Sequence, residues 1–187
     1  MCLVDRLNTS IPGITPAEVA KLDKLAQTAV FTSQGVPFIY AGEEVMRDKK
    51  GVHNSFQSPD SINAIDWSRK ALHADVFAYY KGLMQLRRNH PAFRLGSADA
   101  VRQHLEFLPV EGSNVIAFRL KENAGGDAWK EIVVVLNART ELAKVNVPDG
   151  KYTVVCRDGI INEQGLGTLY GPELQVPARS ALIVYQK

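Results

Sequence analysis

The sequence predicts an α+β protein in which a helix, a strand, a long loop and a second helix precede an antiparallel β-sandwich. In the first half, apolar residues recur at the three- and four-residue spacing of amphipathic helices. In the second half, short runs of β-forming residues alternate with turn signals. The chain has 187 residues, of which 45% are hydrophobic and 22% charged, so it is long enough and apolar enough to bury a core.

The first helix is expected over residues 16–34. Thr15 precedes Pro16 at the first helical position, and Glu18 stands three residues after Thr15, which is the pattern of a capping box. One face then carries the apolar residues Val19, Leu22, Leu25, Ala26, Ala29 and Val30. Gly35 is well placed to end this helix.

The apolar segment 36–42 follows at once and predicts a strand buried on both faces, the type found in parallel sheets. The loop 45–71 is rich in Asp, Asn, Ser, Gly and Lys, and loops of this length tend to be functional or mobile. A second helix is expected over 74–89, ended by His90 and Pro91. A single parallel strand cannot form a sheet, so we expect this half to be an incomplete unit.

From about residue 95 the sequence predicts an antiparallel β-sandwich. Its turn signals include Gly112, Gly150 and Gly159 with their polar neighbours. Between the turns, β-rich runs are expected over 104–108, 115–120, 132–137, 143–147, 152–156 and 181–185. We therefore expect two domains, residues 1–94 and residues 95–187.

Composition excludes several classes of partner and site. The net charge of +2 gives no reason to expect nucleic acid, and no apolar run approaches the roughly 18 residues of a membrane span. Cys2 and Cys156 lie far apart without a C-x-x-C pattern, so we expect two unpaired thiols, and the compartment stays open. No P-loop or dinucleotide fingerprint is present. Metal-ligand spacing is likewise absent from the histidines, which are His53, His73, His90 and His104.

The polar loop is the candidate binding site. It combines amides, hydroxyls, carboxylates and aromatic rings, the mixture that sugar hydroxyls and the apolar face of a pyranose require. The candidate residues are Tyr40, Glu43, Asn54, Ser55, Asp60 and Asn63. The alternative is a loop that ties itself down by Asx turns and a Trp67 anchor, with Glu43 as a structural partner.

No catalytic pair is expected in this chain. Hydrolysis of a glycosidic bond needs two carboxyl groups that face each other across the bond. Glu43 and Glu44 are adjacent, and neighbouring residues on an extended strand point to opposite faces.

Several segments resemble known glycoside hydrolases. Residues 35–44, Gly-Val-Pro-Phe-Ile-Tyr-Ala-Gly-Glu-Glu, resemble the segment around the last barrel strand of the alpha-amylase superfamily. Residues 54–67, with Asn-Ser-Phe, Pro-Asp-Ser-Ile-Asn and Asp-Trp, resemble type I pullulanases in particular. The helix end 86–93 and residues 179–184 are also similar to that family, so the resemblance covers nearly the whole chain.

This resemblance implies that residues 1–94 are the partial end of a (β/α)₈ barrel and that an antiparallel β-domain follows. It also implies hydrolysis of α-1,6 linkages in pullulan or branched α-glucans, without an organic cofactor. The family's catalytic aspartates and glutamate map to no position here, because the segment similar to residues 2–7 follows the family's last catalytic motif. Val4 stands where many relatives carry tryptophan. We therefore expect the chain to be inactive alone and to self-associate through exposed barrel surface.

A stand-alone carbohydrate-binding module is the alternative from a different class. An exposed row of aromatic side chains on the β-half would favour it. The candidates are Phe107, Phe118, Trp129, Tyr152, Tyr170 and Tyr185, several of which fall in strand patterns typical of a core.

Overall fold

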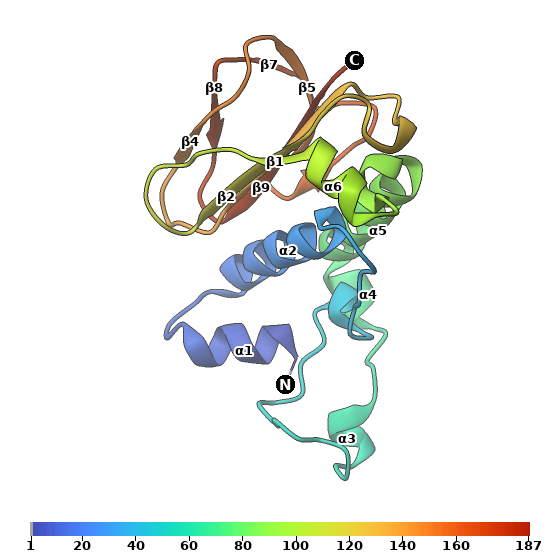
Figure 1. The fold of residues 1–187 in the computed structure, drawn as a ribbon. Coiled ribbons are helices and arrows are strands. Elements are labelled where there is room, and N and C mark those ends of the chain that lie inside the picture. Colours follow the sequence, from blue (N-terminus) through green and yellow to red (C-terminus); the bar gives the residue numbers. More distant parts are fainter. Residues whose placement is uncertain (1) are drawn as a thin grey trace.

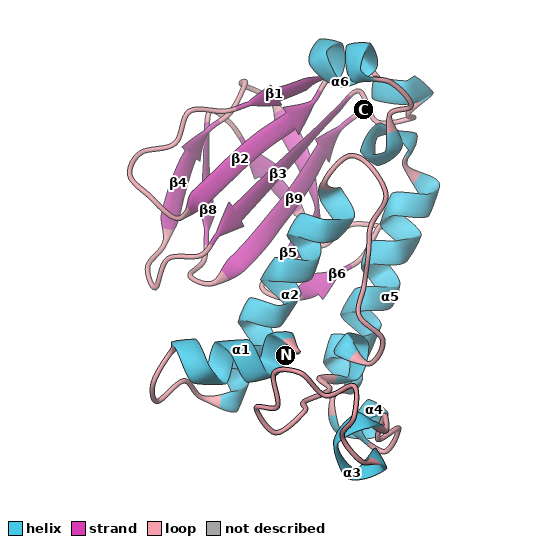
Figure 2. Ribbon diagram, turned by 60° about the horizontal axis from the view of Figure 1, so that its bottom comes forward, coloured by secondary structure: helices cyan, strands magenta, loops and turns pink. Residues whose placement is uncertain are grey.

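The computed structural model describes residues 2–187 and places a seven-stranded sheet between a layer of helices and a two-stranded sheet (Figure 1, Figure 2). The helices are α1 (Leu3–Ser10), α2 (Pro16–Thr32), α3 (Asp60–Asn63), α4 (Arg69–Leu72), α5 (Ala74–Asn89) and α6 (Ala98–His104). Short 3₁₀ turns are η1 (Glu43–Val45), η2 (Pro91–Arg94) and η3 (Ala124–Gly126). The strands are β1 (Leu105–Phe107), β2 (Val115–Leu120), β3 (Glu131–Asn137), β4 (Ala143–Asn146), β5 (Lys151–Arg157), β6 (Ile160–Ile161), β7 (Thr168–Tyr170), β8 (Glu173–Val176) and β9 (Ser180–Gln186).

The predicted antiparallel β-sandwich is confirmed. The large sheet has the strand order β1-β2-β3-β9-β5-β6, with β7 also paired to β5, and β4 pairs with β8 to form the small sheet. The central strands β3 and β9 are paired in antiparallel register, with Val133 opposite Val184. Because side chains alternate along a strand, Ile132 and Val134 face the helices whereas Val133 and Val135 face the small sheet.

Helices α2 and α5 cover the other face of the large sheet (Figure 2). Their side chains Phe31, Tyr80 and Leu83 belong to the same buried cluster as Ile132 and Ile183 of the sheet. The helical part therefore shares its core with the β-half, and the expected boundary at residue 94 stays a prediction.

Both long helices lie close to their expected positions. The hydroxyl of Thr15 accepts a hydrogen bond from the Glu18 N–H, and the Glu18 carboxylate accepts from the Thr15 N–H, so the predicted capping box is present. The helix ends at Thr32, slightly before the expected residue 34. Helix α5 spans the predicted residues 74–89.

The predicted strand over 36–42 is wrong. Val36 is 96% exposed and Phe38 is 87% exposed, whereas Ile39 packs partly against the core. Residues 36–40 have no regular secondary structure, and among residues 2–187 no strand pairs with them to form a ladder. A strand exists only when a neighbour takes up its backbone hydrogen bonds, so the apolar pattern alone cannot make one.

Several short helices and strands were also not predicted from the sequence. Helices α1 and α6 and strands β6, β7 and β8 were not expected from the sequence, nor were the short helices α3 and α4 within the predicted loop 45–71. His104 ends α6 rather than starting a strand. Ser97 caps α6 by accepting from the Ala100 N–H. These elements have too few residues to show a periodic apolar face.

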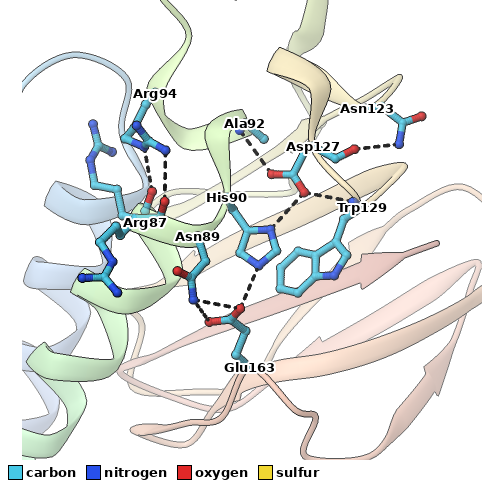
Figure 3. Close-up of polar contacts among 10 residues, drawn as sticks. Arg87, Asn89, His90, Ala92, Arg94, Asn123, Asp127, Trp129 and Glu163 are labelled. Carbon is cyan, nitrogen blue, oxygen red and sulfur yellow. Dashed lines mark hydrogen bonds and ion pairs between the residues drawn. The ribbon is translucent and has the colours of Figure 1, made fainter.

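A buried histidine fastens the end of α5 to the sheet (Figure 3). His90 stacks on Trp129 with ring centroids 3.5 Å apart, and Trp129 stacks on Tyr185 of β9 at 3.9 Å. On the ring edges, His90 contacts the carboxylates of Asp127 and Glu163. This cluster joins four segments that are distant in sequence, around residues 90, 127–129, 163 and 185.

Both cysteine thiols are buried and unpaired, as predicted. No helix within residues 2–187 combines the length and apolar character needed to cross a membrane.

Candidate functional site

The loop 45–71 folds around two buried basic side chains, Arg47 and Lys49. Arg47 donates to the carbonyl of Ala41 at 3.0 Å and to the carbonyl of Asn63. Lys49 donates its ammonium group to Ser55 Oγ and, at 3.0 Å, to Asn63 Oδ1. These contacts give both buried cations the hydrogen-bonding partners that a buried charge needs, although Arg47 Nε is left without one.

Asn63 stabilises a β-turn within the loop. Its side-chain Nδ2 donates to the carbonyls of Ser55 and Ser58, each at 2.7 Å. The Ser58 N–H donates to the Ser55 carbonyl at 2.9 Å, which closes a β-turn over residues 55–58. Asn63 therefore uses its amide to shape the loop rather than leaving it free.

Asp5 of α1 connects the N-terminal helix to the same loop. This buried carboxylate accepts from the backbone N–H groups of Lys49 and Gly51, each at 2.9 Å, and from the Cys2 N–H at 3.3 Å. Sequence reasoning missed Asp5, Arg47 and Lys49. Their long-range partners leave no local pattern, although Asp5 three residues after Cys2 is a capping signal.

Tyr40 lies beside the two basic side chains. The guanidinium of Arg47 and the ammonium of Lys49 are each 5.4 Å from the centre of its ring, within the range of cation–π attraction. Tyr40 is 41% exposed, so part of the ring remains open to solvent.

Glu43 belongs to a separate polar cluster, formed with side chains of α2. It lies in the 3₁₀ turn η1, not on an extended strand, and its carboxylate accepts from Gln27 Nε2 at 3.0 Å. Burial raises the pKa of Glu43. The nearby Asp23 carboxyl is fully buried and accepts from the Tyr80 hydroxyl at 3.0 Å. Burial, with the Glu43 charge adding to it, raises the pKa of Asp23 to about 7, although the Tyr80 hydrogen bond opposes the shift.

The structure thus sorts the predicted site residues into three groups. Ser55 and Asn63 are brought together by Lys49, with Tyr40 next to them. Asn54 and Asp60 are exposed, and within residues 2–187 no hydrogen bond to their side chains is formed. Glu43 faces α2 instead of the loop turn.

This arrangement leaves the polar groups of Asn54 and Asp60 at the surface, whereas the carboxyl group of Asp23 is fully buried. The Glu43 charge adds to burial in raising the pKa of Asp23, and the Glu44 charge adds to burial in raising the pKa of Glu43. No group of three or more His, Cys, Asp and Glu side chains among residues 2–187 is placed to hold a metal ion.

The aromatic residues of the β-half do not form a binding row. Phe118, Trp129, Tyr152 and Tyr185 are buried in the core clusters. The exposed ones are Phe107 on β1 and Tyr170 on β7, which lie toward opposite sides of the strand order. Nothing on this surface favours a carbohydrate-binding module.

Comparison with known proteins gives consistent matches. A family model described as "Pullulanase, all-beta domain" matches residues 101–160. The pullulanase of Bacillus subtilis (strain 168) is 37% identical over 153 residues, covering 81% of this chain and 21% of that protein. The chain therefore spans about a fifth of the length of this curated relative.

Solved structures extend the match over the whole chain. The pullulanase from Bacillus acidopullulyticus superposes with a TM-score of 0.95 at 45% identity, covering 100% of this chain and 23% of its own. The Paenibacillus barengoltzii pullulanase in complex with maltohexaose and alpha-cyclodextrin has a TM-score of 0.87 at 38% identity, covering 98% of this chain and 28% of its own.

Proposed function

Because the chain belongs to the pullulanase family, we propose that it supplies the end of the catalytic barrel and the following β-domain of an enzyme that cleaves α-1,6 linkages in pullulan and branched α-glucans. The observation that carries this proposal is the match to the Bacillus acidopullulyticus pullulanase, which includes helices, loop and sheet in one superposition.

The exposed segment 36–40 supports a barrel origin for residues 1–94. Val36 and Phe38 face solvent although they are apolar. Inner strands of a parallel barrel are apolar on both faces and take their hydrogen bonds from neighbours on either side. The segment has the composition of such a strand and lacks its neighbours among residues 2–187.

The glucan substrate is supported by the relatives and by the chemistry of the loop. The Paenibacillus barengoltzii enzyme was solved with maltohexaose and alpha-cyclodextrin. Asn54 and Asp60 offer free polar groups at the loop surface, and neutral or singly charged groups of this kind orient sugar hydroxyls. We therefore assign loop 45–71 to substrate contact in the complete enzyme.

We further propose that the chain has no hydrolytic activity alone. A retaining glycosidase needs a carboxylate nucleophile and a carboxylic acid about 5–5.5 Å apart at the bond. Asp23 is fully buried and hydrogen-bonded to Tyr80, and the half-buried Glu43 accepts from Gln27, so these two carboxyl groups are not both open to a glycosidic bond. Incubation of the purified chain with pullulan should release no reducing sugar above the blank.

A chimera tests the assignment directly. The matching C-terminal portion of the Bacillus acidopullulyticus pullulanase is replaced by residues 1–187 of this chain, and the same enzyme truncated before that portion is the control. The chimera should release reducing sugar from pullulan, whereas the truncated control should not. A folded chimera without activity, or activity of the chain alone, would contradict the proposal.

We propose that the isolated chain associates with a second copy of itself. An apolar groove of about 550 Å³ runs between α1, α2 and the adjacent ends of strands β2 and β3. It is lined by residues such as Leu7, Leu22 and Ile116. Together with Val36 and Phe38 this leaves apolar surface in water, which favours association with a second copy. Sedimentation across a dilution series should show a dimer that dissociates; a strict monomer at all concentrations would contradict it.

A further inference from the structure

The β-turn over residues 55–58 holds an aromatic ring and an amide at its corner. Phe56 and Gln57 occupy the two central positions of the turn closed by the hydrogen bond from Ser58 N–H to the Ser55 carbonyl. Phe56 is 78% exposed, and Gln57 is also exposed. The ring of Phe56 and the amide of Gln57 are therefore both open to a ligand.

The turn is tied down from several sides. Lys49 binds Ser55 Oγ, while Asn63 binds the carbonyls at both ends of the turn. Lys49 in turn is placed by Asp5, which accepts from its backbone N–H. The corner is therefore set before a ligand arrives, and preorganisation of this kind reduces the entropic cost of binding.

The corner is also electrically neutral. Residues 51–59, Gly-Val-His-Asn-Ser-Phe-Gln-Ser-Pro, contain no Asp, Glu, Lys or Arg. The nearby cations, Arg47 and Lys49, are buried and each donates a hydrogen bond to Asn63. A neutral surface with one ring face and one amide suits an uncharged polyol better than a nucleotide, an acidic peptide or an anionic membrane.

We propose that the Phe56–Gln57 corner is a glucan contact, in which the Phe56 ring stacks on the apolar face of a glucose unit and the Gln57 amide binds its hydroxyls. This inference rests on the proposed function and names the residues that meet the substrate. Ser55 and Asn63 then act as positioning residues, because their polar groups are occupied in holding the turn. An aromatic ring supplies contact area with few rotatable bonds, and an amide both donates and accepts.

The test titrates the full ¹⁵N-labelled chain with maltohexaose and follows backbone amide shifts by NMR. The amides of residues 55–58 should shift in a saturable way. Phe56→Ala should raise the dissociation constant for maltohexaose by about fivefold or more, as expected for loss of a stacking ring. Phe56→Tyr should retain wild-type affinity. Phe107→Ala is the matched control, since Phe107 is an exposed aromatic on β1, and its variant should bind as the wild type does.

Asn63→Ala separates positioning from contact. This variant should weaken binding and also change the amide shifts of residues 55–58 before any sugar is added, whereas Phe56→Ala should leave the unliganded turn largely unchanged. Thermal unfolding of each variant checks that the fold is intact.

The outcomes distinguish this inference from the proposed function. Equal maltohexaose affinity of Phe56→Ala and wild type, or no binding by the wild-type chain, would overturn the corner assignment even if the chimera hydrolyses pullulan. If Phe56 proves necessary for binding while the folded chimera is inactive, the corner stands as a glucan contact and the proposed function falls.

Discussion

The imidazole Nδ1 of His90 lies 2.9 Å from Oδ1 of Asp127, and this buried pair joins the end of helix α5 to the loop between β2 and β3. Asp127 also accepts from the backbone N–H groups of Trp129 at 2.9 Å and Ala92 at 3.3 Å. Asp127 therefore ties together backbone from both sides of the expected domain boundary (Figure 3). Burial by itself raises the pKa of Asp127, but the hydrogen bonds from His90 and Trp129 outweigh burial and hold it below its usual value.

Asp127→Ala should cost about 3–5 kcal/mol of unfolding free energy, because it leaves His90 and two backbone donors buried without their partner. The measurement is the urea midpoint at neutral pH. Asp99→Ala is the control, since Asp99 has a 92% exposed side chain and should change the midpoint little. A loss at Asp127 no larger than the control would show that the pair does not fasten the helix.

The depressed pKa of Asp127 also predicts an acid-side loss of stability. Its folded pKa lies below the unfolded value, so its contribution is present above pH ~4 and is lost as the pH falls through the folded pKa. In Asp127→Asn, thermal unfolding from pH 5 to pH 2 should show a shallower decline than the wild type. Equal slopes would assign the acid loss to other carboxylates.

Asp23 should have the opposite pH dependence. Its folded pKa is raised to about 7, so the unfolded chain ionises near pH 4 while the folded chain still holds the proton. Stability should therefore fall as the pH rises from 4 to 7, with a slope of up to about 1.4 kcal/mol per pH unit.

Asp23→Asn keeps an oxygen to accept from Tyr80 and removes this charge. The variant should be more stable than the wild type at pH 8 and should lose the decline between pH 4 and 7, while Asp99→Asn should retain it. The Glu43 charge raises the folded pKa of Asp23, so Glu43→Gln should lower the pH at which the decline ends, while its start near pH ~4 is unchanged. A wild-type curve that is flat over this window would contradict the prediction.

Gly82 of α5 faces β6 at a contact with no room for a methyl group. A Cβ at residue 82 would lie 2.2 Å from Cγ2 of Ile161. Alanine normally stabilises a helix interior, yet overpacking costs about 1–3 kcal/mol, so Gly82→Ala should destabilise. Gly96→Ala, where nothing lies within 4 Å of the added Cβ, is the control. The double variant with Ile161→Ala should recover much of the Gly82→Ala loss; failure to do so would place the strain elsewhere.

Arg87 holds the chain that leaves α2. Its guanidinium donates to the carbonyls of Phe31 at 2.8 Å, Ser33 at 2.7 Å and Gly35. Arg87→Met should destabilise by about 1.5–3 kcal/mol or more, because charged hydrogen bonds to buried carbonyls are lost. Amide hydrogen exchange over residues 31–39 should speed up in this variant, and the exposed Arg88→Met should leave it unchanged.

Local sequence was sufficient for helix α2, helix α5 and the core strands. The capping box at Thr15 and Glu18 forms between residues three apart, and the alternation from Ile132 to Val135 follows from the pleat of one strand. The polar residue types of loop 45–71 single out a candidate site on the same local basis, and that site and its substrate contacts stay a prediction.

Local sequence patterns could not predict contacts between residues that are distant along the chain. The Asp5 carboxylate accepts a hydrogen bond from the Lys49 N–H, 44 residues away in sequence. His90 forms a hydrogen bond with Asp127, 37 residues away. The same holds for segment 36–42, whose apolar residues suit a strand but find no neighbour among residues 2–187. Helix periods and caps depend on contacts within a turn or two of the chain, whereas ladders, buried ion pairs and loop ties exist only when folding brings remote backbone and side chains within hydrogen-bonding distance.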